Sequence, residues 1–254
     1  MRIEVFSDVG CPWCYIGKRR FERALAQFPH RDQVEVEWKS YQLDPSLPEH
    51  DPRSEVEYLT QVKGLPEDQV HQMLAHVASQ ALTENLHYDF DSLVVANSWK
   101  AHRVIQRAKA VSLEAAAELE EQLFSAHFER GQDIGAEDVL VALGQAAGLT
   151  ADQVREALTD SAWEDRVRSE LQEARTLGVT GVPFFVLDRT YGISGAQPTG
   201  LFAQALERAW AEHQPLQMVS PVAGASGAGA SGGLPDDGTQ AGLDGQVCGP
   251  EGCD

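Results

Sequence analysis

Cysteine is scarce in this chain. The 254 residues include only Cys11, Cys14, Cys248 and Cys253. So few cysteines exclude the dense disulfide scaffold of a small secreted domain. A chain of this length, with 43% hydrophobic residues, can bury a core without cross-links. The cysteines form two local pairs and are therefore available for chemistry.

Positive charge is also scarce, since 20 Lys and Arg stand against 39 Asp and Glu, giving a net charge of -19. Such a surface repels phosphate backbones and anionic lipids, so we expect neither nucleic acid nor membrane as a partner. No apolar run approaches the roughly 18 residues of a spanning helix. Glu4 interrupts the first apolar stretch, which argues against a cleavable signal peptide. We therefore expect a cytoplasmic protein, in which paired cysteines indicate catalysis, sensing or metal binding.

The first 40 residues carry a strand, a helix and a second strand. Residues 2–7 and 34–38 alternate in the manner of strands, and apolar residues recur at helical spacing over 12–28, before Pro29. This order is typical of two parallel strands joined by a crossover helix. The strand signal returns at 183–188 and 191–194, followed by a helix over about 199–213.

The segment between these two parts contains no convincing strand. Amphipathic helical stretches cover 66–80, 92–111, 113–130 and 136–147. Thr150 and Gln153 fit a capping box ahead of a further helix, or a broken pair of helices, that ends before Gly178. The sequence thus predicts an α/β fold with a mixed sheet, interrupted by a large all-helical insertion.

The motif Cys11-Pro12-Trp13-Cys14 stands where the first strand gives way to the first helix. A thiolate at a helix N-terminus is stabilised by free backbone N–H groups and the helix dipole. Cys14 lies one helical turn further on, so it can resolve a mixed disulfide that Cys11 forms. Trp13 either shields the sulfur and contacts unfolded substrates or is simply an exposed apolar residue, and the sequence does not separate these readings.

A lone CxxC can also be half of a zinc site. Here the motif bridges a strand and an amphipathic helix, and no second CxxC or HxxxH follows. His71 and His76 are five residues apart, which is not a spacing at which they share a ligand-forming helix face. We therefore expect no metal and no cofactor beyond the redox-active cysteine pair itself.

Residues 7–17 (SDVGCPWCYIG) and 178–187 (GVTGVPFFVL) together resemble the DsbA-like thioredoxin superfamily, specifically its FrnE-type branch, and NSWKAHR at 97–103 is similar to that branch too. The similarity covers about residues 1–213. It implies a discontinuous thioredoxin-like domain (1–53 and 177–213) and a helical insertion domain (54–176). After these, the composition shifts to Gly, Ala, Ser and Pro, which predicts a flexible tail (214–254). Sequence alone favours a trans Val182–Pro183 bond. The resemblance instead implies a cis bond beside Cys11, where an extended substrate chain pairs with the backbone of Val182.

The chain departs from this family at one place. Many thioredoxin-like enzymes carry a buried acid for proton transfer six residues before the first cysteine, and Val5 stands there instead. Glu4 and Asp8 are close in sequence, but a strand alternates its faces and Asp8 lies in the following turn. We expect both carboxylates to be solvated, which leaves the proton relay without a residue.

The second pair encloses a turn-prone Gly-Pro-Glu-Gly stretch, so a disulfide between Cys248 and Cys253 is sterically easy. The Gly-, Ala- and Ser-rich segment before it is long enough to let it visit the first pair. We expect a second redox pair, while a stabilising clip and a metal site remain alternatives.

The leading hypothesis is a cytoplasmic protein disulfide reductase, oxidase or isomerase, favoured as a monomer, that acts on protein thiols and disulfides with a thiol reductant or oxidant. One alternative is a glutathione-dependent transferase or isomerase of the kappa and chromene-carboxylate isomerase type. Those relatives carry serine where Cys11 stands, so the cysteine pair argues against this class. The other alternative is a redox-sensing chaperone, which binds exposed peptides without turnover.

Overall fold

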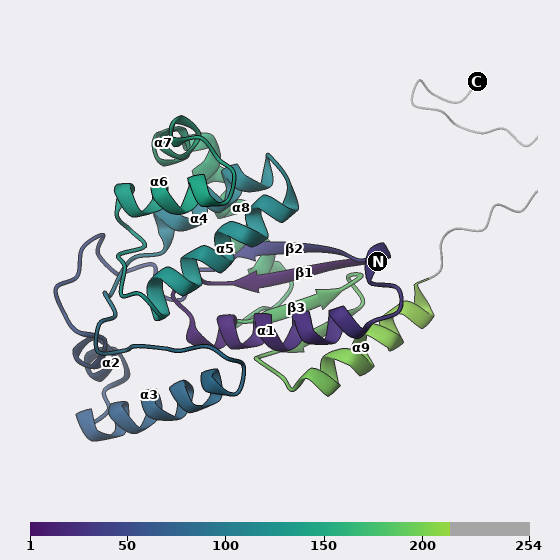
Figure 1. Ribbon diagram of the computed structural model, residues 1–254, viewed down its shortest axis with the longest axis horizontal. Coiled ribbons are helices and arrows are strands. Elements are labelled where there is room, and N and C mark those ends of the chain that lie inside the picture. Colours follow the sequence, from purple (N-terminus) through teal and green to yellow (C-terminus); the bar gives the residue numbers. More distant parts are fainter. Residues whose placement is uncertain (214–254) are drawn as a thin grey trace, which may run out of the picture. The chain divides into compact units, whose positions relative to one another are not determined.

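A mixed sheet of four strands organises the part of the chain that the computed structural model describes, residues 1–213. β1 (Arg2–Ser7) pairs in parallel with β2 (Glu35–Ser40). β3 (Phe184–Leu187) pairs antiparallel with β1, and β4 (Tyr191–Ser194) pairs antiparallel with β3. The order is therefore β2-β1-β3-β4, as Figure 1 shows for the strands it labels, and it places β1, which leads into the CPWC motif, inside the sheet.

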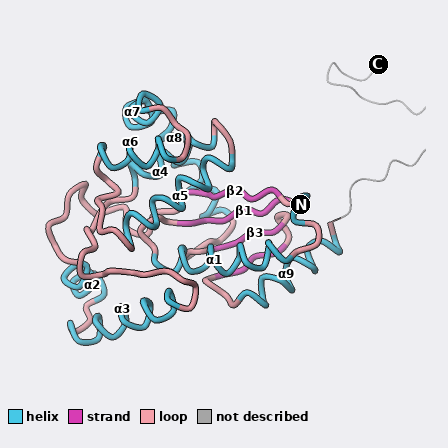
Figure 2. Tube along the Cα trace, in the orientation of Figure 1, coloured by secondary structure: helices cyan, strands magenta, loops and turns pink. Residues whose placement is uncertain are grey.

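One face of the sheet is covered by α1 (Pro12–Gln27) and α9 (Thr199–Glu212), which lie side by side in Figure 2. β1 alternates, so Ile3 and Val5 point to this face and join a core with Phe21 of α1 and Phe202 of α9. The short 3-10 helix Arg31–Gln33 then leads from α1 into β2. α1 and α9 are the helices that the sequence predicts over 12–28 and about 199–213.

The other face of the sheet packs on α8 (Ser161–Thr176), because Phe6 of β1 and Val186 of β3 contact Ala174. The remaining helices between β2 and β3 are α2 (Glu55–Lys63), α3 (Glu67–Leu82), α4 (Trp99–Lys109), α5 (Leu113–Phe128), α6 (Glu137–Ala146) and α7 (Ala151–Thr159). α3 lies alongside α1, where Arg20 donates a hydrogen bond to Gln80. The expected α/β architecture with a helical interruption is confirmed.

Two details of the helical segment differ from the sequence prediction. The helix expected over 92–111 begins only at Trp99, because the preceding residues run as a loop that buries Leu93 and Val95. α2 was not among the predicted stretches, although Ser54 and Glu57 form a capping box at its start. All described residues belong to one compact unit, and the predicted division into 1–53 with 177–213 and 54–176 stays a prediction.

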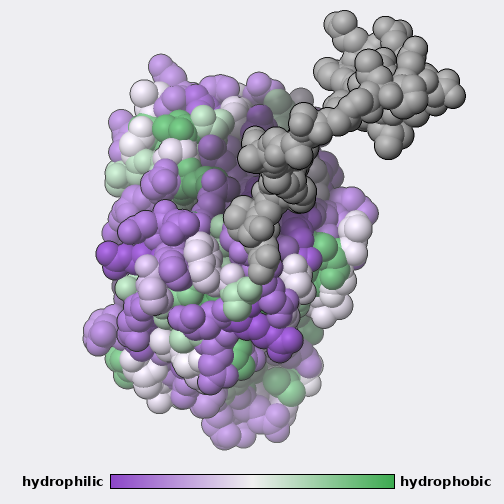
Figure 3. Space-filling model, turned by 90° about the vertical axis from the view of Figure 1, so that its right-hand side faces the viewer, coloured by the Kyte–Doolittle hydropathy of each residue, from purple (hydrophilic) through white to green (hydrophobic). Residues whose placement is uncertain are grey.

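The face of the molecule drawn in Figure 3 is largely polar. Hydrophilic side chains predominate on this face, with hydrophobic ones scattered among them. None of the helices between residues 1 and 213 combines the length and apolar character that crossing a bilayer requires.

Candidate active site

The CPWC motif occupies the N-terminus of α1. Cys11 is the N-cap residue, and Pro12 begins the helix. The backbone N–H of Cys11 donates to the carbonyl of Asp8 at 2.9 Å, and that of Cys14 donates to the carbonyl of Cys11 at 3.0 Å. No side chain caps α1, and its first turn carries no acidic residue, so nothing in the described chain competes with Cys11 for the helix-end amides.

The two sulfurs have different surroundings. Cys11 keeps 4% of its surface exposed, whereas Cys14 keeps none. Burial, together with the neighbouring Cys11 sulfur, raises the pKa of the Cys14 thiol well above its usual range. Of the two cysteines, Cys11 thus retains the little surface that remains exposed, and Cys14 favours its protonated form.

The Val182–Pro183 segment lies directly against the motif. The bond is cis, as the resemblance implies, and the Cys11 Sγ lies 3.7 Å from the carbonyl oxygen of Val182. Gly17 makes this approach possible, since a Cβ on that residue would lie 2.8 Å from the Pro183 ring. The sequence therefore brings residues 11 and 182 together across 171 positions.

Aromatic side chains surround the motif on the side of the helical segment. The hydroxyl of Tyr88 donates to the carbonyl of Pro12 at 2.7 Å, and its ring stacks on Tyr15 with centroids 6.2 Å apart. Trp13 is partly buried, and its ring lies 6.2 Å from that of His76 on α3. The Trp13 side chain thus packs against the helical segment and is not a freely exposed residue.

The expectation that Asp8 is solvated is wrong. Asp8 is 3% exposed, and its carboxylate accepts backbone N–H groups from Gly10 at 3.2 Å and Leu43 at 2.7 Å. His102 lies 3.4 Å from the same carboxylate. Burial alone would raise the pKa of Asp8, but the contacts with His102 and Leu43 outweigh it and lower the pKa. Asp8 therefore fixes the turn that carries Cys11.

The expectation for Glu4 is wrong as well. Glu4 is 1% exposed, forms an ion pair with Arg189, and lies 3.6 Å from the Nζ of Lys39. Buried charges persist where such partners compensate for lost hydration. Glu4 shares its face of β1 with Phe6, away from the face that Val5 and Ser7 occupy, so it is no candidate for proton transfer to the cysteines.

Residues 2–207 match the family described as DSBA-like thioredoxin domain. The chain belongs to this family. It is 38% identical to a crystal structure described as a probable DsbA oxidoreductase from Streptomyces coelicolor, with a TM-score of 0.81 over 100% of this chain and 98% of that one. It is also 28% identical over 214 residues to the uncharacterized protein YwbO of Bacillus subtilis (strain 168), covering 81% of this chain and 96% of the relative.

The DSBA-like fold extends to more distant structures. A cytosolic disulfide reductase DsbM from Pseudomonas aeruginosa, determined with GSH, shares 18% identity and a TM-score of 0.60 over 83% of this chain and 100% of that one. Membership of the FrnE-type branch stays a prediction.

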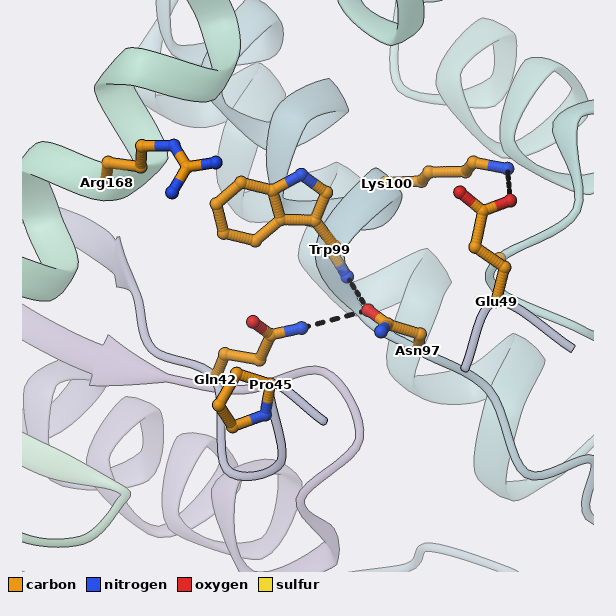
Figure 4. A pocket seen from close by; sticks show the side chains of 8 residues that line it. Gln42, Pro45, Glu49, Asn97, Trp99, Lys100 and Arg168 are labelled. Carbon is orange, nitrogen blue, oxygen red and sulfur yellow. Dashed lines mark hydrogen bonds and ion pairs between the residues drawn. The ribbon is translucent and has the colours of Figure 1, made fainter. Parts of the chain in front are cut away.

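The NSWKAHR motif of this DSBA-like chain ties the loop after β2 to α4. The Oδ1 of Asn97 accepts from the Nε2 of Gln42 and the backbone N–H of Trp99, each at 2.9 Å. These residues line a cavity of about 320 Å³, in which Arg168 lies over the Trp99 ring and Lys100 pairs with Glu49 (Figure 4). Because the same motif supplies His102 to Asp8, it supports the active-site turn from behind.

Sequence reasoning missed a buried polar cluster behind Cys14. Its members retain at most 4% of their surface: Ser7, Asp8, His102, Glu120 and His127. The Oγ of Ser7 and the Nδ1 atoms of His102 and His127 make no hydrogen bond within the described residues. A signal was present, since Glu120 and His127 interrupt the apolar face that Ala116, Leu123 and Phe124 give to α5.

The remaining predicted site residues cannot be placed. Cys248 and Cys253 lie outside the described residues, as does the whole predicted tail. Between residues 1 and 213, no group of three or more His, Cys, Asp or Glu side chains is arranged to hold a metal ion.

Proposed function

We propose that the protein exchanges thiols and disulfides with protein substrates, with Cys11 as the attacking sulfur and Cys14 as the resolving sulfur. The observation that supports this proposal best is the difference between the two cysteines. Cys11 retains 4% of its surface and Cys14 none, and the Cys11 sulfur lies beside Val182. Family membership over residues 2–207 supports the same chemistry.

In the reductive direction, the Cys11 thiolate attacks a substrate disulfide and forms a mixed disulfide, releasing one substrate thiolate. Cys14 then attacks the Cys11 sulfur and releases the second. The reverse order inserts a disulfide into a dithiol substrate. The buried position of Cys14 supports this division of roles, because a substrate that reaches Cys11 has no route to Cys14.

Substrate binding is proposed for the residues around Cys11. An extended chain laid against Val182 pairs with its backbone as an added strand, and Pro183 fixes that segment. Pro12 and Trp13 provide the opposite, apolar wall. Because backbone pairing carries little sequence information, this arrangement suits a broad set of protein disulfides.

We further propose a cytoplasmic monomer that needs no cofactor beyond its cysteines and is returned to the reduced state by a thiol reductant. Cys248 and Cys253 are proposed as a second redox pair that exchanges electrons with Cys11 and Cys14. Replacing both tail cysteines with serine tests this. Loss of electron transfer to the first pair is the expected result, and unchanged turnover and redox state of the first pair would contradict it.

The main experiment is thiol trapping with Cys11→Ala and Cys14→Ala variants expressed in cells. Cys14→Ala should accumulate mixed disulfides on Cys11. The matched control, in which both Cys11 and Cys14 are replaced by alanine, should form no mixed disulfide at either position. The wild type should reduce insulin over multiple turnovers with a regenerating thiol. Glutathione conjugation without insulin reduction, or peptide binding without turnover, would contradict the proposal.

A further inference from the structure

The resolving step needs a base for the Cys14 thiol. Cys14 is fully buried, so bulk water does not reach its sulfur. Its raised pKa, caused by burial and by Cys11, keeps the proton in place at neutral pH. In thioredoxin-like enzymes that carry a buried acid on the first strand, that acid can take the proton. Here Val5 stands at the corresponding place in β1, packed among apolar side chains such as Phe21 and Phe185.

Ser7 is the polar side chain that faces Cys14 from the same side of the sheet. It lies two residues after Val5 on β1 and is 1% exposed. Its hydroxyl has no hydrogen-bond partner among the described residues. Burial raises the pKa of both Cys14 and Glu120, and in each case Ser7 is among the neighbours that oppose the rise. A hydroxyl can donate to one neighbour while it accepts from another, and the Ser7 hydroxyl has both functions free among the described residues.

Glu120 projects from α5 into this space. It is 2% exposed and makes no ion pair within the described residues, whereas its neighbour Glu121 pairs with Lys18 and Arg19. Burial raises the pKa of Glu120 to about 7, with the Ser7 hydroxyl and nearby cations acting in the opposite direction. A carboxyl with this pKa holds and releases a proton near neutral pH, as a general base requires.

The charged groups around Glu120 come from two other helices. They are His102 and Lys109 on α4 and Lys18 on α1. Lys18 is already engaged with Glu22 and Glu121, and Lys109 with Glu170. The charged side chains of the adjacent strand, Glu37 and Lys39 of β2, pair with Arg2 and Glu173. No cation is therefore committed to Glu120 as a dedicated partner within the described residues.

We propose that Glu120 is the proton acceptor for Cys14, acting through Ser7, and that the helical segment thereby supplies the acid that β1 lacks. This inference rests on the proposed exchange chemistry. In the mixed disulfide, the Cys14 thiol passes its proton through Ser7 to the Glu120 carboxylate. The Cys14 sulfur then bonds to the Cys11 sulfur, the bond from Cys11 to the substrate sulfur breaks, and the substrate leaves as a thiolate that takes a proton from solvent.

The electrons balance without a further group. Two electrons pass from the dithiol to the substrate disulfide, which leaves a Cys11–Cys14 disulfide. When a thiol reductant reopens that disulfide, Glu120 returns the proton to Cys14. Ser7 and Glu120 thus position and store one proton and do not touch the substrate.

The test follows the decay of one mixed disulfide in the full-length protein. Reduced protein is mixed with an aromatic disulfide probe, 5,5′-dithiobis(2-nitrobenzoate), and quenched with acid at set times. It is then digested with pepsin at the same low pH, where thiols do not exchange, and analysed by mass spectrometry. Every protein in the test also carries Cys248→Ser and Cys253→Ser, so Cys14 is the remaining thiol of the chain that can resolve the adduct on Cys11. The variants are Glu120→Gln, Glu120→Asp and Ser7→Ala, with Glu118→Gln as the matched control on the exposed face of α5.

In the wild type, the decay rate should rise with pH and level off above about pH 7, as Glu120 loses its proton. Glu120→Gln and Ser7→Ala should slow the decay by about tenfold or more at pH 7.5. For Glu120→Gln the plateau above pH 7 should disappear, and the decay rate should rise with hydroxide concentration over the whole pH range. Glu120→Asp should restore part of the rate and the levelling, Glu118→Gln should match the wild type, and formation of the adduct on Cys11 should be unchanged in all of them.

The outcomes distinguish the role of Glu120 from the thiol-disulfide exchange on which it rests. A Glu120→Gln protein whose decay is as fast as that of the wild type, or faster, with the same pH profile overturns the proton acceptor. Faster decay is what a merely electrostatic role predicts, because removing a nearby negative charge favours the Cys14 thiolate. A wild type that forms no adduct on Cys11, or whose adduct is as long-lived as in Cys14→Ala, overturns the exchange chemistry itself.

Discussion

Replacing Glu120 with glutamine should stabilise the fold while it slows the chemistry. The pKa of Glu120 is raised from an ordinary 4.5 to about 7, chiefly by burial. The unfolded chain therefore loses this proton at lower pH than the folded protein does, and stability falls as pH rises from 4.5 through 7. This loss of stability is absent below pH 4.5, the ordinary pKa, and complete above about pH 7, the pKa in the folded protein. Glutamine has nearly the same shape as the neutral acid and escapes this cost.

The size of the effect follows from the same two pKa values. The wild-type penalty is about 1 kcal/mol at pH 5 and about 3 kcal/mol at pH 8. For a protein of this size, 3 kcal/mol corresponds to a rise of roughly 6–12 °C in the melting temperature. Because Glu120 is 2% exposed, solvent screening takes little from this value.

Thermal melts of the wild type, Glu120→Gln and the exposed control Glu118→Gln between pH 5 and pH 8 measure it. The gain in Tm for Glu120→Gln should grow steadily with pH, while the control should follow the wild type at every pH. A difference that does not change with pH, or a variant less stable than the wild type at pH 8, would refute the reasoning that Glu120 is a buried carboxyl with a raised pKa.

Three further outcomes are expected. Burial lowers the pKa of His127 to about 4, so the free energy of unfolding should fall as the pH is lowered from 6.5 to 4. His127→Asn should remove about 2–3 kcal/mol of that fall, measured from urea midpoints at pH 7 and pH 4.5. Asp8→Asn should cost about 1–3 kcal/mol by weakening the bond from the Leu43 N–H, and increased alkylation of Cys14 by iodoacetamide should report the loosened turn. Tyr88→Phe should lower stability by about 1 kcal/mol in denaturant titration, because its hydrogen bond to Pro12 is lost.

The regular elements could be predicted because their signals are local. Alternation over residues 2–7, the apolar spacing of 12–28 and the Thr150 capping box each specify an element without reference to the rest of the chain. The loop before Trp99 could not be predicted in this way. It is apolar enough to look helical, but the side chain of Asn97 bonds to Gln42, more than fifty residues earlier.

The CPWC pair and the Val182–Pro183 segment were identified because their residue types are unusual and their order matches a family. The errors at Glu4 and Asp8 have one physical cause. A charged residue near a strand end is solvated unless partners compensate for its burial, and those partners, Arg189 and His102, are distant in sequence. Local position alone therefore gives the wrong burial for both carboxylates.

Packing explains why β1 carries no acid at residue 5. A carboxyl at residue 5 would point into a layer that holds Phe21, Phe185 and Phe202, where apolar side chains leave it no polar partner. Ser7, at the end of the same strand, is the last position on that face before the turn to Cys11, and it belongs to the buried polar cluster. An acid on α5 can thus reach the serine without entering the aromatic layer.

This placement makes the helical segment a participant in the proposed chemistry, in addition to a cover for the sheet. The cysteine pair belongs to the strand-helix-strand unit, whereas Glu120 and the histidines of the buried polar cluster come from α4 and α5. If Glu120 accepts the proton from Cys14, then any movement of α5 relative to β1 changes how readily Cys14 resolves a mixed disulfide, while the attack by Cys11 is unaffected. Substitutions that loosen the contact of α5 with the sheet should therefore lengthen the life of the mixed disulfide before they reduce its rate of formation.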